Sequence, residues 1–263
     1  MARVPGHVAV TFQALVLAGS RPGVDPLAAY AGIADKAMIV VGGQTMLARV
    51  IAALRAAGAA RIVVSASAEV VRAHAVELGA EVMDTAEGPS ASVGMAFDRI
   101  GAPLLVTTAD HALLQGEWIA QFLADIPPRG DVAVLLARRE RIERDAGATA
   151  RTYLRFADGA WSGCNLFYLA TPRAADAIRL WRRVERDRKR PWRIVFRLGP
   201  VLLLRYLTRR LTLASALAFI GAKAGVRAAM VESRFGLAAV DVDKPADLDL
   251  ARRLTPAAPR QHP

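Results

Sequence analysis

The chain has 263 residues, 54% of them hydrophobic, which is enough to bury a large core. Lysine and arginine outnumber aspartate and glutamate by 35 to 24, and the resulting net charge of +11 attracts anions such as nucleotides, nucleic acid and lipid headgroups. Cys164 is the only cysteine, which excludes an intramolecular disulfide. No stretch approaches the roughly 20 uncharged apolar residues of a membrane span, and the first residues do not resemble a signal peptide. We therefore expect a cytoplasmic protein.

The first clear element is a short buried strand that runs into a glycine-rich loop. Residues 14–17 are an unbroken apolar run, and Gly19, Pro22 and Gly23 interrupt it directly afterwards. Open α/β sheets bind ligands at loops that leave the carboxyl ends of parallel strands. Exposed backbone N–H groups in this loop, together with Arg21 and Lys36, suit a polyphosphate.

Strands and helices then alternate along the chain. Thr45 is a good N-cap for a helix through residue 57, and Gly58 ends that helix. A strand at 61–65, a helix at 69–78 and a short strand at 81–83 follow. This alternation predicts a doubly wound, mostly parallel sheet of the α/β class.

The segment 87–94 predicts a loop that runs into a helix, with Ser90 or Ser92 as the N-cap. The strand at 103–108 is the strongest in the chain and ends at Asp110. An acid at the mouth of a sheet is costly to desolvate unless it holds a cation, so Mg²⁺ is its natural partner. We expect His111 to be a solvated loop residue.

Several elements follow in the second half of the chain. We expect a helix at 116–124, a strand at 131–136 and then a charged excursion at 138–150, which is either solvated or an acceptor-binding arm. Strands at 151–156 and 163–169 are joined by a turn at Asp158 and Gly159. Helices are expected at 172–183 and 212–222.

The segment 182–225 contains a basic stretch followed by an apolar one. Its densest positive charge lies at 182–193, and the apolar stretch covers 194–207. Such a pattern is typical of helices that lie on an anionic membrane, but also of a packed helical subdomain with a solvated cationic rim. Lys189, Arg190 and Arg193 are our candidates for binding an acceptor here. We expect no nucleic-acid partner, because only the net charge supports one.

Near the carboxyl terminus, residues 238–243 predict a short strand that ends in two acids, Asp241 and Asp243. Asp243 is the expected N-cap of the helix that Pro245 begins. We expect one domain over residues 1–255, with 182–225 as a helical insertion within it, and a disordered tail at 256–263.

The motifs LAGSRPG, DKAMIVVGGQTML and DVDKPADL occur in the order that is found in the MobA-like NTP transferases, the relatives of the molybdenum-cofactor guanylyltransferases, and the chain resembles this family. It departs from the family at Ser20, where a glycine is usual, and in a longer segment before Lys36. The resemblance implies a GT-A-like fold. It also implies triphosphate and nucleoside binding by Leu17, Ala18, Gly19, Ser20, Arg21, Gly23, Lys36, Ser90, Ser92 and Val93.

For the chemistry, the resemblance implies transfer of a nucleoside monophosphate (NMP) from a nucleoside triphosphate (NTP) to a phosphorylated acceptor, with release of pyrophosphate. Arg21, Lys36 and Asp110 are then catalytic. Asp110 and Asp241 bind Mg²⁺, Asp243 is a cap, a ligand or both, and Asn165 faces the acceptor. A GT-A glycosyltransferase is an alternative, although such enzymes usually carry an Asp-x-Asp pair. A nucleotide-binding protein that has lost its activity is another.

Overall fold

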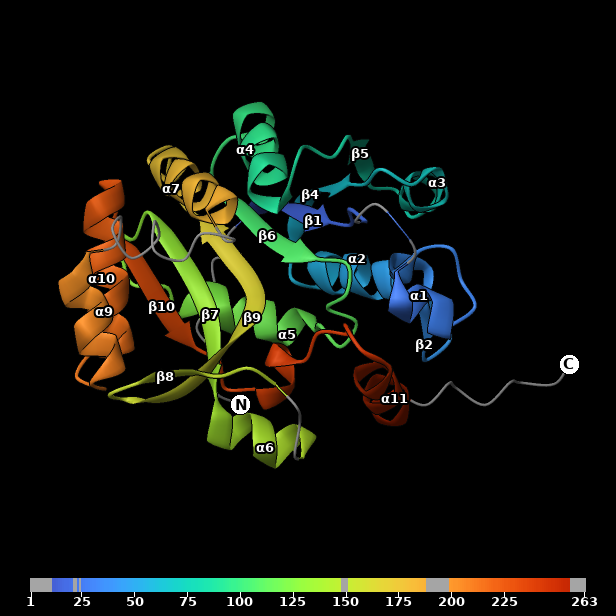
Figure 1. Cartoon of the computed structure of the whole chain (residues 1–263). Coiled ribbons are helices and arrows are strands. Elements are labelled where there is room, and N and C mark those ends of the chain that lie inside the picture. The colour runs from blue at the N-terminus through green and yellow to red at the C-terminus, as the bar shows by residue number, and fades with distance from the viewer. Residues whose placement is uncertain (1–10, 21–22, 24, 148–150, 188–198, 256–263) are drawn as a thin grey trace, which may run out of the picture.

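The computed structural model describes residues 11–20, 23, 25–147, 151–187 and 199–255. These residues form an eight-stranded sheet in the order β10-β7-β9-β6-β1-β4-β5, with β8 paired to β9 (Figure 1). The strands are β1 (Phe12–Leu17), β4 (Ala59–Ser65), β5 (Glu81–Met83), β6 (Leu104–Thr108), β7 (Val132–Arg138), β8 (Leu154–Phe156), β9 (Gly159–Leu169) and β10 (Ala228–Glu232). A separate small hairpin joins β2 (Val40–Val41) to β3 (Gln44–Thr45).

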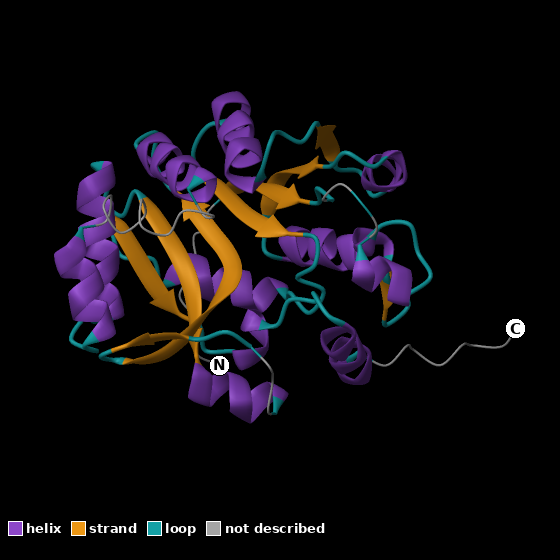
Figure 2. Ribbon diagram, in the orientation of Figure 1, coloured by secondary structure: helices purple, strands orange, loops and turns teal. Residues whose placement is uncertain are grey.

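Helices cover both faces of the sheet (Figure 2). The strands alternate their side chains between two apolar cores, so that Val16 packs on one face and Leu15 on the other. The first core includes α2 (Met46–Ala56), α3 (Glu69–Glu77) and α5 (Gly116–Ala124), and the second includes α4 (Pro89–Ile100) and α7 (Ala174–Arg186). The remaining helices are α1 (Pro26–Tyr30), α6 (Arg139–Ala146), α9 (Pro200–Leu207), α10 (Leu213–Ala224), α11 (Pro245–Leu254) and the 3₁₀ turns η1 (Lys36–Met38) and η2 (Gly236–Ala239).

Among the described residues, four of the seven strand pairs in the main sheet are parallel, which confirms the mostly parallel α/β fold expected from the sequence. Strand β1 pairs in parallel with β4 and β6, and β7 pairs in parallel with β10. Strand β9 is the exception, because it lies antiparallel between β6 and β7. The carboxyl ends of β1 and β6 therefore meet at one edge, where Ala109 N–H donates to the carbonyl of Leu17 at 2.9 Å.

Many predicted elements are confirmed. The hairpin between β8 and β9 turns at Asp158 and Gly159 as expected, with Phe156 paired to Gly159. Helix α2 is capped by the Thr45 side chain, which accepts from the Ala48 N–H. The helix at 116–124 has the predicted bounds.

Other predictions of local structure are wrong. The N-cap of α4 is Gly88, while Ser90 and Ser92 lie buried inside the helix. Residues 138–150 were expected to form a solvated excursion or an arm, but α6 occupies 139–146 and buries Ile142 against the core. Residues 238–243 form no strand, since η2 ends at Ala239. Helix α11 is capped at Lys244 rather than at Asp243, because Asp247 accepts from the Lys244 N–H at 3.1 Å.

Two elements had no clear sequence signal. The segment that lengthens the approach to Lys36 forms α1, and the Asp25 carboxylate caps it by accepting from the N–H groups of Leu27 and Ala28. Strand β10 extends the sheet beyond β7 and follows α10. Helices α9 and α10 lie together at the β10 end of the sheet (Figure 1). No helix in the described ranges has the length and apolar character needed to span a bilayer.

His111 is not a solvated residue, contrary to the prediction. Its side chain is 1% exposed and its ring lies 6.4 Å from that of Trp118. Burial lowers the pKa of His111 to about 4, so the imidazole is neutral at neutral pH. The chain turns inward directly after Asp110, and Leu113 and Leu114 follow His111 into the core. His111 is therefore a packing residue.

A buried neutral histidine makes stability depend on pH. The unfolded chain binds a proton at His111 below about pH 6.5, and the folded chain does so only near pH 4, so this contribution is complete above pH 6.5 and falls as the pH drops toward 4. Between pH 7 and pH 5 the loss is roughly 2 kcal/mol. We expect His111→Leu to unfold in urea with a correspondingly smaller change in unfolding free energy between these pH values. An unchanged pH slope in this variant would contradict the assignment.

Candidate active site

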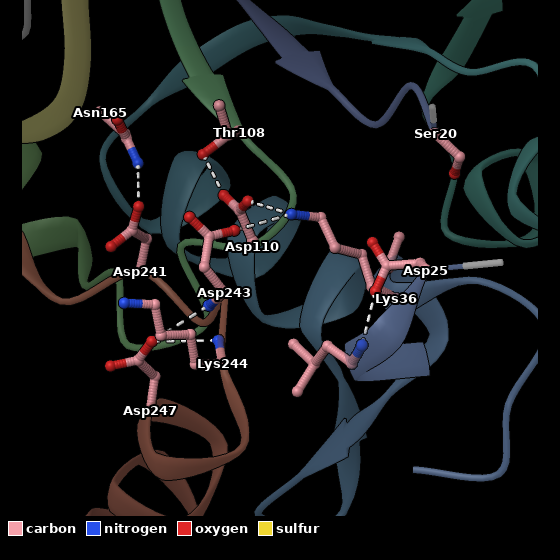
Figure 3. A network of polar contacts seen from close by, with 12 residues as sticks. Ser20, Asp25, Lys36, Thr108, Asp110, Asn165, Asp241, Asp243, Lys244 and Asp247 are labelled. Carbon is pink, nitrogen blue, oxygen red and sulfur yellow. Dashed lines mark hydrogen bonds and ion pairs between the residues drawn. The ribbon is translucent and has the colours of Figure 1, made fainter. Parts of the chain in front are cut away.

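Lys36 lies between two carboxylates that come from distant parts of the chain. Its ammonium is 2.6 Å from Asp110 Oδ2 and 3.0 Å from Asp243 Oδ1, as Figure 3 shows. Asp110 follows β6, Asp243 precedes α11, and Lys36 begins η1. The Thr108 hydroxyl donates to Asp110 Oδ1 at 2.5 Å, so both oxygens of Asp110 are held. The structure thus brings together three of the residues that the sequence selected.

The charges of this group depend on one another. Burial alone lowers the pKa of Lys36, but Asp110 and Asp243 outweigh it and raise that pKa well above its ordinary value. Burial raises the pKa of Asp110, and Lys36 and Thr108 oppose that rise. The pKa of Asp110 is still raised above its ordinary value, and Lys36 is the cation that most favours the charged form of this buried carboxylate.

The loop after β1 is tied to the turn that carries Lys36. The Ser20 hydroxyl donates to Asp35 Oδ2, and Asp35 Oδ1 accepts from the Ala37 N–H at 2.9 Å, capping η1. Ser20 thus replaces the usual glycine with a link that holds η1 against the loop. Gly19 is exposed, and a side chain there would press on Thr85, since its Cβ would lie 3.1 Å from Thr85 Cγ2. Arg21 lies outside the described residues.

Asp241 is held apart from Lys36 by its own partners. Arg151 Nη1 donates to Asp241 Oδ1 at 2.7 Å. Asn165 Nδ2 donates to Asp241 Oδ2 at 3.1 Å, and Figure 3 shows these two side chains pointing toward each other. Burial alone raises the pKa of Asp241, but Arg151 and Asn165 hold it below its ordinary value. Asn165 has a left-handed backbone, with φ of 49°, which turns its side chain out of the regular pleat of β9.

Arg151 was not selected from the sequence, although it is the strongest partner of Asp241. It also donates to the Asp241 carbonyl at 2.9 Å, and its side chain is 11% exposed. The sequence contains 35 lysines and arginines, and nothing in the local pattern distinguishes Arg151 from the others. The signal is tertiary, because the two partners are 90 residues apart.

The predicted nucleoside-binding residues of α4 are enclosed. Ser90, Ser92 and Val93 are 3%, 4% and 1% exposed, and the Ser92 hydroxyl accepts from the Ala86 N–H. The Ser90 N–H at the start of the helix donates to Glu185 Oε2 of α7 at 3.1 Å. Nucleotide contact by these three residues stays a prediction. The acceptor candidates Lys189, Arg190 and Arg193 lie outside the described residues.

The oxygen donors at this edge suit Mg²⁺. Among the described residues, no three His, Cys, Asp or Glu side chains form a group that could cage a metal. Mg²⁺ usually takes only one or two carboxylates and completes its shell with water and substrate phosphates. Asp110 and Asp243, which converge on one ammonium, fit that requirement. Asp241 fits it less well, because each of its oxygens already accepts a hydrogen bond.

Comparisons with known proteins agree with this arrangement. A profile described as MobA-like NTP transferase domain matches residues 14–201. No curated protein sequence matches the chain. A structure of a hypothetical transferase from Thermus thermophilus is 28% identical, with a TM-score of 0.79, and the match covers 91% of this chain and 100% of that one.

Two more distant structures share the fold. A nucleotidyl transferase from Methanothermobacter has 17% identity and a TM-score of 0.55, with 94% of this chain and 98% of that chain covered. A CMP:2-keto-3-deoxy-manno-octonic acid synthetase complexed with CTP has 15% identity and a TM-score of 0.55, and the match covers 92% of this chain and 98% of that chain. At these identities the likeness shows the fold alone.

The Arg151–Asp241 pair can be tested by stability. Removing Arg151 leaves a partly buried carboxylate with only Asn165 as a partner, and because the two side chains are 11% and 23% exposed we expect a loss nearer 2 kcal/mol than the larger cost of a fully buried pair. Arg151→Met should lower the free energy of urea unfolding by that amount, and Asp241→Asn in the same background should recover part of it. A loss in the double variant equal to the sum of the losses in Arg151→Met and Asp241→Asn alone would show that the pair is not coupled.

Proposed function

We propose, since the chain belongs to the MobA-like NTP transferase domain family, that it transfers an NMP from an NTP to a phosphorylated acceptor and releases pyrophosphate. The convergence of Lys36, Asp110 and Asp243 beside the loop after β1 is the observation that carries this proposal. These groups lie at the carboxyl edge of the parallel strands, where open α/β sheets bind ligands. Membership of this family also favours nucleotidyl transfer over the glycosyltransferase alternative.

The reaction needs alignment and charge neutralisation more than acid–base chemistry. An acceptor phosphate oxygen, already anionic at neutral pH, attacks the α-phosphorus of the NTP. The bond from that phosphorus to the oxygen that bridges to the β-phosphate breaks, and pyrophosphate leaves with the electron pair. No proton has to be removed, so the neutral, buried His111 is not required as a base. Positioning and electrostatic stabilisation are sufficient for chemistry of this kind.

Each group of site residues then has its own role in this reaction. The exposed loop after Ala18 offers backbone N–H groups to the triphosphate, and Lys36 supplies a cation that offsets the charge on the α-phosphate and the departing pyrophosphate. Asp110 and Asp243 would hold Mg²⁺, which would add positive charge to the triphosphate oxygens. Asp241 is fixed by Arg151 and Asn165 on the side of the site that faces β9, where we place the acceptor.

We expect Asp110→Asn to reduce NTP-dependent pyrophosphate release at least about a hundredfold, because the metal loses its most buried carboxylate ligand. Release is measured with each of the four common NTPs and a panel of phosphorylated metabolites. Asp98→Asn is the matched control, since Asp98 is an exposed carboxylate on α4. Turnover near the wild-type rate in Asp110→Asn would refute the assignment. If calorimetry showed that the protein binds a nucleotide-sugar more tightly than an NTP with Mg²⁺, that result would support the glycosyltransferase alternative.

Lys36 and a divalent cation compete for the same two carboxylates. We therefore expect Lys36→Met to bind Mn²⁺ about tenfold more tightly than the wild type in the absence of nucleotide, while NTP turnover falls. Mn²⁺ binding is followed by electron paramagnetic resonance at pH 8. Lys244→Met is the control, because the Lys244 ammonium is hydrogen-bonded to neither carboxylate within the described structure. Weaker Mn²⁺ binding in Lys36→Met would show that the lysine and the metal do not share this position.

A further inference from the structure

The outer face of α9 exposes large apolar side chains in a row. Val201, Leu204 and Leu207 are 68%, 62% and 67% exposed, and their spacing of three residues places them along one side of the helix. Single exposed leucines are common on protein surfaces, but three on one short helix are not. Most of α9 lies beyond residue 201, where the family match ends.

The opposite side of α9 is firmly packed, which fixes the direction that the helix presents. Leu202 is buried with Leu211 and Ala216, and the Tyr206 ring meets the Phe156 ring edge-on at 5.3 Å. Because α9 already packs its other side against the protein, the apolar row is not the core-facing side of this helix.

An arginine-lined pocket adjoins this helix. It has a volume of about 370 Å³ and is lined by Arg139, Arg155 and Arg209 around Phe156 and the β8–β9 turn. Arg139 is paired with Glu143 at 2.6 Å. Within the described part of the chain, Arg155 and Arg209 contact no carboxylate. Two unpaired guanidinium groups in one concavity repel each other unless an anion joins them, and phosphate is the anion that best matches their geometry.

The segment that carries the apolar row is positively charged. Residues 199–213 contain no aspartate or glutamate, and Arg205 and Arg210 are exposed beside the apolar row. A soluble protein partner would need acidic groups and an apolar patch in matching places. An anionic bilayer supplies both at once, because lipid phosphates meet the arginines while leucine side chains enter the headgroup region.

We propose that Val201, Leu204, Leu207, Arg155 and Arg209, named here the α9 surface, dock the protein on an anionic phospholipid bilayer, with one lipid phosphate held in the arginine pocket. The sequence suggested a membrane contact from basic residues between 186 and 193, most of which lie outside the described residues. The α9 surface supports such a contact from different residues. It does not depend on the proposed function, because binding to lipid requires no nucleotide.

The pocket is separate from the site of phosphoryl chemistry. Gly159 lines the pocket, and Asn165, which contacts Asp241, follows it by six residues in the same strand β9, a separation of roughly 20 Å in extended backbone. A phosphate held by Arg155 and Arg209 is thus not placed to attack an NTP beside Lys36. It anchors the protein at a distance from the reaction.

The test is sedimentation of the full chain with vesicles, without nucleotide. We expect binding to vesicles of phosphatidylcholine and phosphatidylglycerol, little binding to phosphatidylcholine alone, and weaker binding as salt is raised. Leu204→Ser/Leu207→Ser and Arg155→Gln/Arg209→Gln should each lower the affinity about tenfold or more. Leu254→Ser and Arg252→Gln, which change an exposed leucine and an exposed arginine on α11, are the matched controls and should bind as the wild type.

Several results would overturn the proposal. Absence of wild-type binding to the anionic vesicles would do so without any variant. Equal losses in the α11 controls would show that binding is not specific to the α9 surface. A dimer in sedimentation velocity that the α9 variants dissociate would make this face a contact between two copies of the chain. Protection of the pocket arginines by inorganic phosphate, with no vesicle binding, would assign the pocket to a soluble anion. Circular dichroism confirms that each variant is folded.

Discussion

The charge balance around Lys36 is the constraint on which the candidate site depends. One ammonium holds two carboxylates that are 74 and 207 residues away along the chain, and both contacts are 3.0 Å or shorter. Burial raises the pKa of Asp110, and the Lys36 ammonium opposes that rise, so the charged form of Asp110 depends on its cationic partner. The site therefore has a cation at its centre, and removing any one of the three residues removes an electrostatic partner from the group.

The sheet explains how these distant residues meet. Parallel pairing brings the carboxyl ends of β1 and β6 to one edge, and the loops that leave those ends carry Gly19 and Asp110. The antiparallel β9 lies next to β6, and it brings Asn165 to the same edge from the other direction. The segment before α11 closes the arrangement, because the Val242 N–H donates to the Asp110 carbonyl at 2.9 Å. Asp241 and Asp243 are thus fixed on either side of a backbone contact.

Acidic and basic groups are distributed unevenly over this molecule. The carboxylates at the sheet edge are each paired with a cation, whereas arginines at the β8–β9 turn and after α9 are left without carboxylate partners in the described structure. Paired charges hold the site in one geometry, while unpaired charges attract an anion from outside. Under our proposals the excess of basic residues therefore has two roles, and the position of each residue in the fold decides which role it has.

The sequence by itself determined the features that depend on local pattern. The apolar run before Gly19, the strand that ends at Asp110, the caps and glycine stops and the alternation of strand and helix all follow from periodicity and backbone preference, which act over a few residues. The motif order also identified the family, which the profile match confirms.

Only the tertiary structure decided which partners these groups have. Arg151 is an ordinary arginine until the fold places it against Asp241, and His111 is an ordinary loop histidine until the chain turns inward after Asp110. Ser90 and Ser92 are good caps by propensity, yet Gly88 begins the helix, and Glu185 of another helix accepts from the Ser90 N–H. Burial and the pairing of charges are properties of the packed chain, because they depend on which distant segments exclude water from each group, and no local pattern contains that information.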